Sequence, residues 1–250
     1  MMKKFFIFMV IFIFCRCASA EQVLVAAAAN LHYVMDIIEE NFERSNPDID
    51  IVVSTASSGK LTAQIQQGAP FDIFFSANVD FAEKVFEYSG AEPSRIYALG
   101  LLALCVRKGV QRIDSLDILA SDSISFIGIA DPEVAPYGAA AVEALKNSGL
   151  YDEVRDKFAF AQKVSIVNTY IINGTVDAGF TSLSAVYDPA FKDSDYYVVP
   201  SELYSPVKQA CVLLKRDGRV SDAARAFYEY IFMPECKKIF TENGYADYAE

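Results

Sequence analysis

The feature that most constrains the fold is a threefold alternation of short apolar runs and helical segments between residues 23 and 88. Each apolar run ends in small or polar residues, and each is followed by a segment whose apolar residues recur at helical spacing. The runs occupy residues 23–26, 49–53 and 71–75, and the helical segments occupy residues 32–42, 60–67 and 78–88. Short strands that alternate with helices of about ten residues are typical of βαβ units. The pattern therefore predicts an α/β fold built on parallel strands.

The same alternation resumes in a second unit, and the chain ends with a long strand and two helices. In the second unit we expect strands at 101–106, 124–129, 178–181 and 196–199, and helices at 136–147, 151–158 and 165–172. The closing strand lies at 207–215, and the closing helices lie at 223–232 and 234–240. No linker rich in Gly, Ser or Pro separates the units, which favours two lobes joined by strands that cross between them, at 99–107 and 206–215. We therefore predict that residues 21–98 and 206–250 form lobe one, and that residues 99–205 form lobe two.

The first twenty residues have the composition of a secretory signal peptide. Lys3 and Lys4 precede an unbroken apolar run at residues 5–14, and small residues at 18–20 supply a cleavage site. The run is far shorter than the roughly 20 residues that a membrane-spanning helix needs. We therefore expect an exported protein that is cleaved after Ala20.

The five cysteines fall into two groups. Cys15 and Cys17 lie in the leader, where acylation of a cysteine is the alternative to simple cleavage; bulky Phe14 and charged Arg16 beside them favour cleavage. The later cysteines are Cys105, Cys211 and Cys236. An odd, sparse set is not a disulfide framework, so we expect small buried hydrophobes. A disulfide between Cys105 and Cys211 is the alternative, because an export compartment would permit it.

The charge of the chain excludes one class of partner. Loss of the leader removes three basic residues, so the formal net charge falls from −11 to −14. Nucleic acid is bound through lysine and arginine that displace counterions, and a surface this acidic argues against it. Such a surface also gives an anion no long-range attraction, so any anion site must work through local donors.

The sequence holds no complete catalytic motif. His32 is the only histidine, which leaves little material for a Ser-His-Asp triad or a zinc site. Ser57 and Lys60 match the S-x-x-K spacing of penicillin-binding enzymes, but the S-D-N and K-T-G partners are missing. A tyrosine pair at 196–197, as used by some iron-binding transport proteins, opens an apolar strand and is better explained by packing. We therefore expect a protein that is not an enzyme.

Neutral hydrogen-bond donors gather where the predicted strands end. In the first unit they are Asn30, Ser57, Ser58 and Asn78, and in the second Tyr137, Gly138 and the helix start at Ser165. Open parallel sheets bind ligands at the carboxyl ends of their strands, and a helix N-terminus presents free N–H groups and about half a positive charge. Each position taken alone is best explained as an ordinary helix cap. Together on one edge they indicate an anion site that needs no lysine.

Several segments match one family of transport proteins. In lobe one these are AAAANL at 26–31, ASSG at 56–59 and GAPFDIFFSA at 68–77, of which the last is the most specific. In lobe two they are DPE at 131–133, PYG at 136–138 and EAL at 143–145, and near the end FY at 227–228, IF at 239–240 and GY at 244–245. In this order, and over nearly all of the mature chain, the segments resemble the periplasmic molybdate-binding proteins of ABC transporters.

The resemblance implies a two-lobed periplasmic binding protein fold of type II, with parallel-rich sheets and a cleft that closes on a dehydrated oxyanion. It assigns ligand contacts to Asn30 and Ser58 in lobe one, and to Tyr137 and Val164 in lobe two, largely through backbone N–H groups. A tyrosine that often binds the ligand in this family falls at Ser182, where a serine could donate a shorter bond. It also implies a periplasmic monomer that delivers its ligand to the permease subunits of an ABC transporter, with no cofactor and no direct bond from protein to metal.

The expected ligand is molybdate or tungstate. Fixed neutral donors fit a particular arrangement of oxygens, so the size of the cavity becomes the selector, and sulfate would leave some donors unpaired. Molybdate and tungstate have nearly the same size, and the residues do not separate them. Two alternatives stay open, namely a receptor for another oxyanion or ferric ion on the same scaffold, and an exported Ser-Lys hydrolase built on Ser57 and Lys60.

Overall fold

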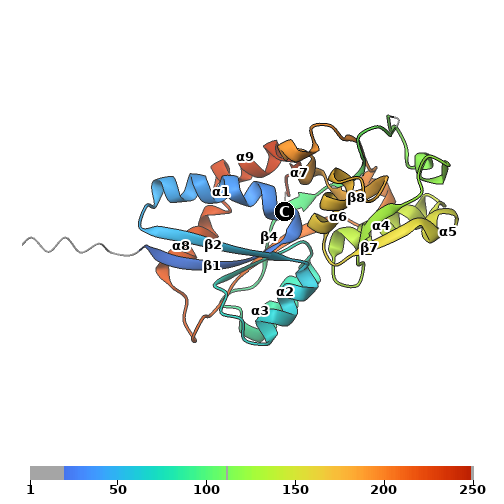
Figure 1. Ribbon diagram of the computed structural model, residues 1–250. Helices are drawn as coiled ribbons and strands as arrows, with labels where there is room; N and C mark the ends of the chain where they lie inside the picture. The colour runs from blue at the N-terminus through green and yellow to red at the C-terminus, as the bar shows by residue number, and fades with distance from the viewer. Residues whose placement is uncertain (1–19, 111, 249–250) are drawn as a thin grey trace, which may run out of the picture.

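The computed structural model describes residues 20–110 and 112–248. The predicted signal sequence, with Cys15 and Cys17, lies outside these residues apart from Ala20. The described chain forms two α/β lobes that lie side by side (Figure 1). No helix within the described ranges is long and apolar enough to cross a membrane.

Lobe one is built on a six-stranded sheet with the order β11-β4-β10-β3-β1-β2. Its strands are β1 (Glu21–Ala28), β2 (Ile49–Ala56), β3 (Ile73–Ser76), β4 (Arg95–Gly100), β10 (Val207–Leu213) and β11 (Tyr245–Ala246). Its helices are α1 (His32–Ser45), α2 (Ser58–Gln66), α3 (Val79–Ser89), α8 (Asp222–Tyr230) and α9 (Pro234–Glu242). A 3-10 turn, Ala29–Leu31, joins β1 to α1.

Lobe two is built on a five-stranded sheet with the order β7-β6-β8-β5-β9. Its strands are β5 (Leu102–Val106), β6 (Ile127–Ala130), β7 (Phe158–Ala161), β8 (Ala178–Ser182) and β9 (Asp195–Val198). Its helices are α4 (Pro136–Asn147), α5 (Tyr151–Val154), α6 (Val164–Ile172) and α7 (Leu183–Val186). Short 3-10 turns at Leu116–Ala120, Arg155–Lys157, Pro189–Phe191 and Ser201–Leu203 connect them.

Both sheets are mixed, with a parallel part where the βαβ pattern predicted one. Strand β1 runs parallel to β2 and β3, and β6 runs parallel to β7 and β8. Strands β5 and β10, which follow the two crossings between the lobes, pair antiparallel with their neighbours. The chain leaves lobe one between Gly100 and Leu102 and returns just before Val207. The prediction of parallel-rich sheets therefore holds for the βαβ segments and not for the strands at the crossings.

One stretch of secondary structure was assigned wrongly from the sequence. The helix expected at 151–158 ends at Val154, and after a 3-10 turn the chain forms strand β7. Phe158 and Phe160 alternate with alanines along this strand, and Phe158 stacks edge-to-face on Tyr151 with ring centroids 5.7 Å apart. Pairing with β6 overrides the weak helical pattern of residues 155–158. Strand formation depends on neighbouring strands, which the local sequence does not contain.

Each sheet is covered by helices on both faces. In lobe one, α1, α8 and α9 pack on one face while α2 and α3 pack on the other (Figure 1). The C-terminal helices thus return to lobe one as expected, and Phe227 of α8 contacts Phe42 of α1 with ring centroids 5.0 Å apart. Full burial of a side chain such as Phe227 stabilises the fold by roughly 1.5–3 kcal/mol.

The three cysteines of the described chain are buried and free. Cys105 lies on β5 in lobe two, and Cys211 lies on β10 in lobe one. The alternative of a Cys105–Cys211 disulfide is therefore wrong, and the expectation of small buried hydrophobes is confirmed. Burial raises the pKa of each thiol, which keeps it protonated and unreactive.

Candidate functional site

Helix starts from both lobes converge on one small pocket. From lobe one it receives the turn after β1 and the start of α2 after β2; from lobe two it receives the starts of α4 and α6. The pocket is lined by Ala28, Ala29, Asn30, Ser57, Ser58, Ala77, Ala135, Pro136, Tyr137 and Val164. Four of the five residues singled out from the sequence, Asn30, Ser58, Tyr137 and Val164, thus lie around the same space.

The helices that meet at this pocket begin without side-chain caps. The residues at the N-cap positions of α2, α4 and α6 are Ser57, Ala135 and Lys163, and none of them caps its helix with a side-chain hydrogen bond. By contrast, Asn78 caps α3 by accepting from Phe81 N at 3.0 Å, so its place at a strand end is explained by capping alone. Uncapped first turns leave N–H groups and the positive end of the helix dipole free for an anion.

Three backbone donors at these helix starts have no acceptor in the described chain. They are the N–H groups of Ser58, Tyr137 and Val164, one from each helix. All three residues are buried, so water cannot readily satisfy these groups. An oxyanion in the pocket would supply the missing acceptors.

Side-chain hydroxyls add further donors. The Oγ of Ser57 and the hydroxyl of Tyr137 are buried and have no hydrogen-bond partner among the described residues. Ser58 Oγ accepts from Ala77 N at 3.0 Å, which leaves its own hydrogen free to donate. Burial raises the pKa of the Tyr137 hydroxyl, so it remains a donor at neutral pH. A buried unpaired donor costs about 1–3 kcal/mol, and a bound acceptor would recover part of that cost.

Asn30 takes a different role from the one that its residue type suggests. Its side-chain Nδ2 donates to Gln209 Oε1 at 2.9 Å and to the Tyr245 hydroxyl at 2.9 Å. Its backbone carbonyl accepts from Ser184 Oγ at 3.0 Å and from Tyr245 at 3.1 Å. Both amide hydrogens are therefore committed within the protein, and what Asn30 offers to the pocket is its main chain.

Ser182 lies behind the pocket rather than on its wall. It is fully buried at the end of β8, and its Oγ lies 2.9 Å from Ser184 Oγ, within hydrogen-bond distance. Ser184 also reaches the Tyr245 hydroxyl at 3.2 Å, so Ser182 ends a chain of hydroxyls that runs to Asn30. Among the described residues that line the pocket, Ser182 does not appear.

This buried polar network was missed from the sequence, although one signal for it was present. Gln209 is the one polar residue on the buried part of a strand whose other buried residues are apolar, and its Nε2 also donates to Val207 O at 3.0 Å. Tyr245 pairs with Gly100 at the crossing between the lobes. A Cβ on Gly100 would lie 2.2 Å from the Tyr137 hydroxyl and 2.7 Å from Gln209 Nε2, so only glycine fits there. The network therefore connects the pocket to both crossings.

The two lobes are in direct contact around the pocket. Gly59 N in α2 donates to Val134 O of lobe two at 3.0 Å. A Cβ on Gly59 would lie 3.0 Å from the Cα and Cβ of Val134, so the absence of a side chain permits this approach. A second contact between the lobes is made by Lys163 Nζ of lobe two, which donates to Thr55 O of lobe one at 3.0 Å.

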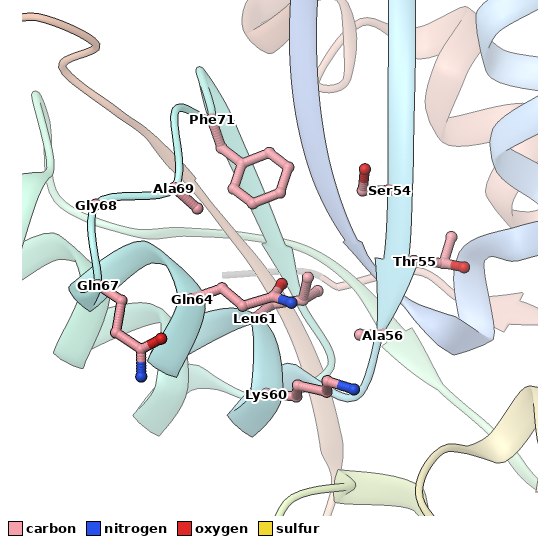
Figure 2. A pocket seen from close by; sticks show the side chains of 10 residues that line it. All are labelled: Ser54, Thr55, Ala56, Lys60, Leu61, Gln64, Gln67, Gly68, Ala69 and Phe71. Carbon is pink, nitrogen blue, oxygen red and sulfur yellow. The ribbon is translucent and has the colours of Figure 1, made fainter.

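A larger groove lies next to this pocket but does not share its chemistry. Figure 2 shows it between α2 and the edge strand β2, with a volume of about 570 Å³, against about 10 Å³ for the pocket between the lobes. It is lined by Ser54, Thr55, Ala56, Lys60, Leu61, Gln64, Gln67, Gly68, Ala69 and Phe71. The starts of α4 and α6 do not reach it, whereas the small pocket collects the uncapped starts of α2, α4 and α6 together. The small pocket is therefore the better candidate.

A family described as bacterial extracellular solute-binding protein matches residues 23–246. The chain belongs to this family. It is 32% identical over 231 residues to the molybdate-binding protein ModA of Azotobacter vinelandii, covering 91% of each chain. It is also 32% identical to ModA of Rhodobacter capsulatus, over 91% of this chain and 89% of that protein.

The solved structures agree with these relatives. The periplasmic molybdate-binding protein of Azotobacter vinelandii superposes with a TM-score of 0.83 at 27% identity, covering 91% of this chain and 100% of that one. The resemblance inferred from the sequence motifs and the two-lobed α/β binding-protein fold are thereby confirmed. These relatives are solute-binding proteins rather than enzymes.

Proposed function

We propose that this protein captures molybdate in the pocket between its lobes and delivers it to an ABC transporter. The observation that carries the proposal is the meeting of three uncapped, buried helix starts from two lobes at one small pocket. The relatives that match over nine-tenths of the chain and carry the name of molybdate-binding protein support the choice of ligand. Tungstate, which has the same shape and charge, is proposed as a second ligand.

The proposed site holds a doubly charged oxyanion with neutral donors. Backbone N–H groups of Ser58, Tyr137 and Val164 and the hydroxyls of Ser57 and Ser58 would each meet an anion oxygen. Each helix start contributes about half a positive charge, so three of them roughly offset the ligand's two negative charges. Asn30 would take part through its main chain. Ser182 would act from behind the pocket, through Ser184, by holding Asn30 in place.

Closure of the lobes is part of the proposal. The pocket has room for little more than one water-sized sphere, so an anion of five heavy atoms requires the lobes to part slightly and close on it. The crossings near Gly100 and Val207 are the places where the chain can bend. A ligand that binds the closed form more tightly shifts the population toward it, and this shape is what a transporter can recognise.

Titration calorimetry on the mature protein tests the proposal directly, since the chain has no tryptophan to report binding by fluorescence. We expect tight binding of molybdate and tungstate and weak or no binding of sulfate. Ligand at a thousandfold excess over Kd should raise the free energy of unfolding by about 4 kcal/mol. Binding of sulfate, phosphate or ferric iron without binding of molybdate would contradict the proposal.

We also propose that the protein acts as a periplasmic monomer after cleavage behind Ala20, with the permease subunits of the transporter as its partner. The composition of residues 1–20 supports export, and the family of extracellular solute-binding proteins agrees with it. Mass spectrometry of the exported protein should give a chain that begins at Glu21. A lipid-modified chain that begins at Cys15 or Cys17 would contradict this cleavage site.

A further inference from the structure

Lys163 connects the two lobes at the edge of the candidate site. It is the residue immediately before Val164, which lines the pocket, and it occupies the N-cap position of α6. Its Nζ crosses to lobe one, where it donates to the backbone O of Thr55 at 3.0 Å and lies 3.5 Å from Thr55 Oγ1. Thr55 is the next-to-last residue of β2, two positions before Ser57. The lysine therefore spans the cleft beside the oxyanion pocket.

The charge on Lys163 has no partner within the described chain. No carboxylate there lies within ion-pair distance of Lys163, or of Lys60, a cation of lobe one whose charge acts on Lys163. Burial, together with the nearby positive charge of Lys60, lowers the pKa of Lys163. A partly buried ammonium without a counter-ion is unfavourable, and an acidic protein has many carboxylates that could have been placed beside it.

We propose that Lys163 is a cross-lobe latch that makes the affinity of the closed form depend on the charge of the bound oxyanion. The proposal rests on the proposed function, because it takes the pocket to be the oxyanion site. Neutral donors at the helix starts would recognise the oxygens, and Lys163 would distinguish a doubly from a singly charged ion. A dianion in the pocket would supply the negative charge that the lysine lacks and so favour the closed lobes.

Lys60 provides a built-in comparison. Figure 2 shows its side chain extending from α2 toward the end of β2, where Thr55 and Ala56 lie. Lys60 is exposed, and in the described structure it makes no hydrogen bond to lobe two, whereas Lys163 is half-buried and is held by an acceptor in the opposite lobe. Water screens an exposed charge far more than a partly buried one. The two lysines thus carry the same charge on the same rim, and only one of them bridges the lobes.

The test compares two tetrahedral oxyanions of similar size, doubly charged tungstate and singly charged perrhenate. Their affinities are measured by calorimetry, with perrhenate also measured by its displacement of tungstate. Lys163→Met is expected to reduce the preference for tungstate over perrhenate by about tenfold, the size of the attraction between two unit charges roughly 10 Å apart at an effective dielectric constant of about 20. Lys163→Gln, which keeps N–H donors without the charge, should lose the same preference. Lys60→Met should change it by less than about threefold, and the exposed Lys237→Met should leave it unchanged.

The outcomes separate the latch from the proposed function. An unchanged preference in Lys163→Met, equal losses for both anions, or a full preference in Lys163→Gln would overturn the latch. A loss in Lys237→Met as large as in Lys163→Met would assign the effect to net charge and overturn it as well. Failure of the unaltered protein to bind tungstate or molybdate would refute the proposed function itself, before any variant is compared. Melting curves without ligand, expected to stay cooperative for all four variants, show that the folds are intact.

Discussion

Substitution of a single glycine, Gly59, by alanine should oppose closure of the lobes without destabilising either lobe. Gly59 lies in the first turn of α2, and its backbone is not in the left-handed region, so alanine can adopt the same conformation. A methyl group there would lie 3.0 Å from the Cα and Cβ of Val134 and 3.0 Å from Cζ of Phe81. The ring of Phe81 belongs to lobe one and can move slightly. The Val134 backbone belongs to lobe two and can escape only if the lobes separate.

The size of the effect follows from two contributions. Crowding against a backbone atom at this distance costs about 1 kcal/mol or somewhat more, the lower end of the range for overpacking. Separation also lengthens the hydrogen bond from Gly59 N to Val134 O, which is worth about 1 kcal/mol. Both act on the closed form alone, so Gly59→Ala should raise the Kd for molybdate by about 30-fold, equivalent to about 2 kcal/mol. Better helix propensity should leave the ligand-free protein as stable as before, or slightly more so.

Calorimetry measures the Kd for molybdate, and denaturant unfolding without ligand measures the stability of the ligand-free protein. Gln66→Ala is the matched control, because it introduces the same residue at an exposed position of the same helix. A Kd for Gly59→Ala within threefold of the unaltered protein would refute the reasoning, since the lobes would then close without this contact. A large loss of stability without ligand would also refute it, because the strain would then lie within lobe one.

Three further predictions concern single side chains. Burial and three nearby carboxylates raise the pKa of Glu39 to about 7, so its charge destabilises the folded state above that pH and the penalty vanishes as the pH falls toward 4.5. Glu39→Gln should therefore raise the free energy of unfolding by about 1 kcal/mol at pH 8, after allowance for solvent screening, and an equal gain at pH 4.5 would contradict this. Asn30→Ala removes the side-chain hydrogen bonds that hold the Asn30 main chain in place, and Ser58→Ala removes a donor hydroxyl, so each should weaken molybdate binding in calorimetry more than Lys60→Ala does. A dominant effect of Lys60 would indicate a charge-based site. Tyr137→Phe removes a buried hydroxyl without a partner and should stabilise the ligand-free protein by about 1 kcal/mol in denaturant unfolding, whereas a loss would mean that the hydroxyl is hydrogen-bonded.

Much of the candidate site could be located from the sequence because its residues lie where local patterns change. Ser58, Tyr137 and Val164 stand where an apolar strand or loop gives way to a helix, and such transitions are legible in the sequence. The rule that parallel strands gather their carboxyl ends at one edge then brings distant segments together. The same rule also gathers residues that do not belong to the pocket. Asn78 lies at that edge, but it serves as an ordinary cap of α3.

The parts that were missed depend on contacts between distant residues. Asn30 and Tyr245 are 215 positions apart, and nothing near either one indicates that the hydroxyl and the amide meet. Lys163 appears in the sequence as one surface lysine among several, and only the approach of Thr55 from the other lobe gives it a distinct role. Strand β7 likewise forms because β6 lies beside it. Local pattern predicts elements and their ends, while polar pairs across the lobes require the assembled fold.

The position of β10 has a consequence for the order in which the protein can fold. This strand is inserted between β3 and β4, yet it comes from the last fifth of the chain, so the sheet of lobe one stays divided until that segment arrives. The sheet of lobe two is formed by one continuous stretch, residues 102–198, so its strands need no pairing partner from later in the chain. A chain that ends before Val207 is therefore expected to protect its amides from hydrogen exchange in lobe two only, and protection across β1–β3 would contradict this. If the chain is exported unfolded, as we propose for a protein with this leader, a lobe that cannot finish before its own C-terminus is present stays competent for that passage.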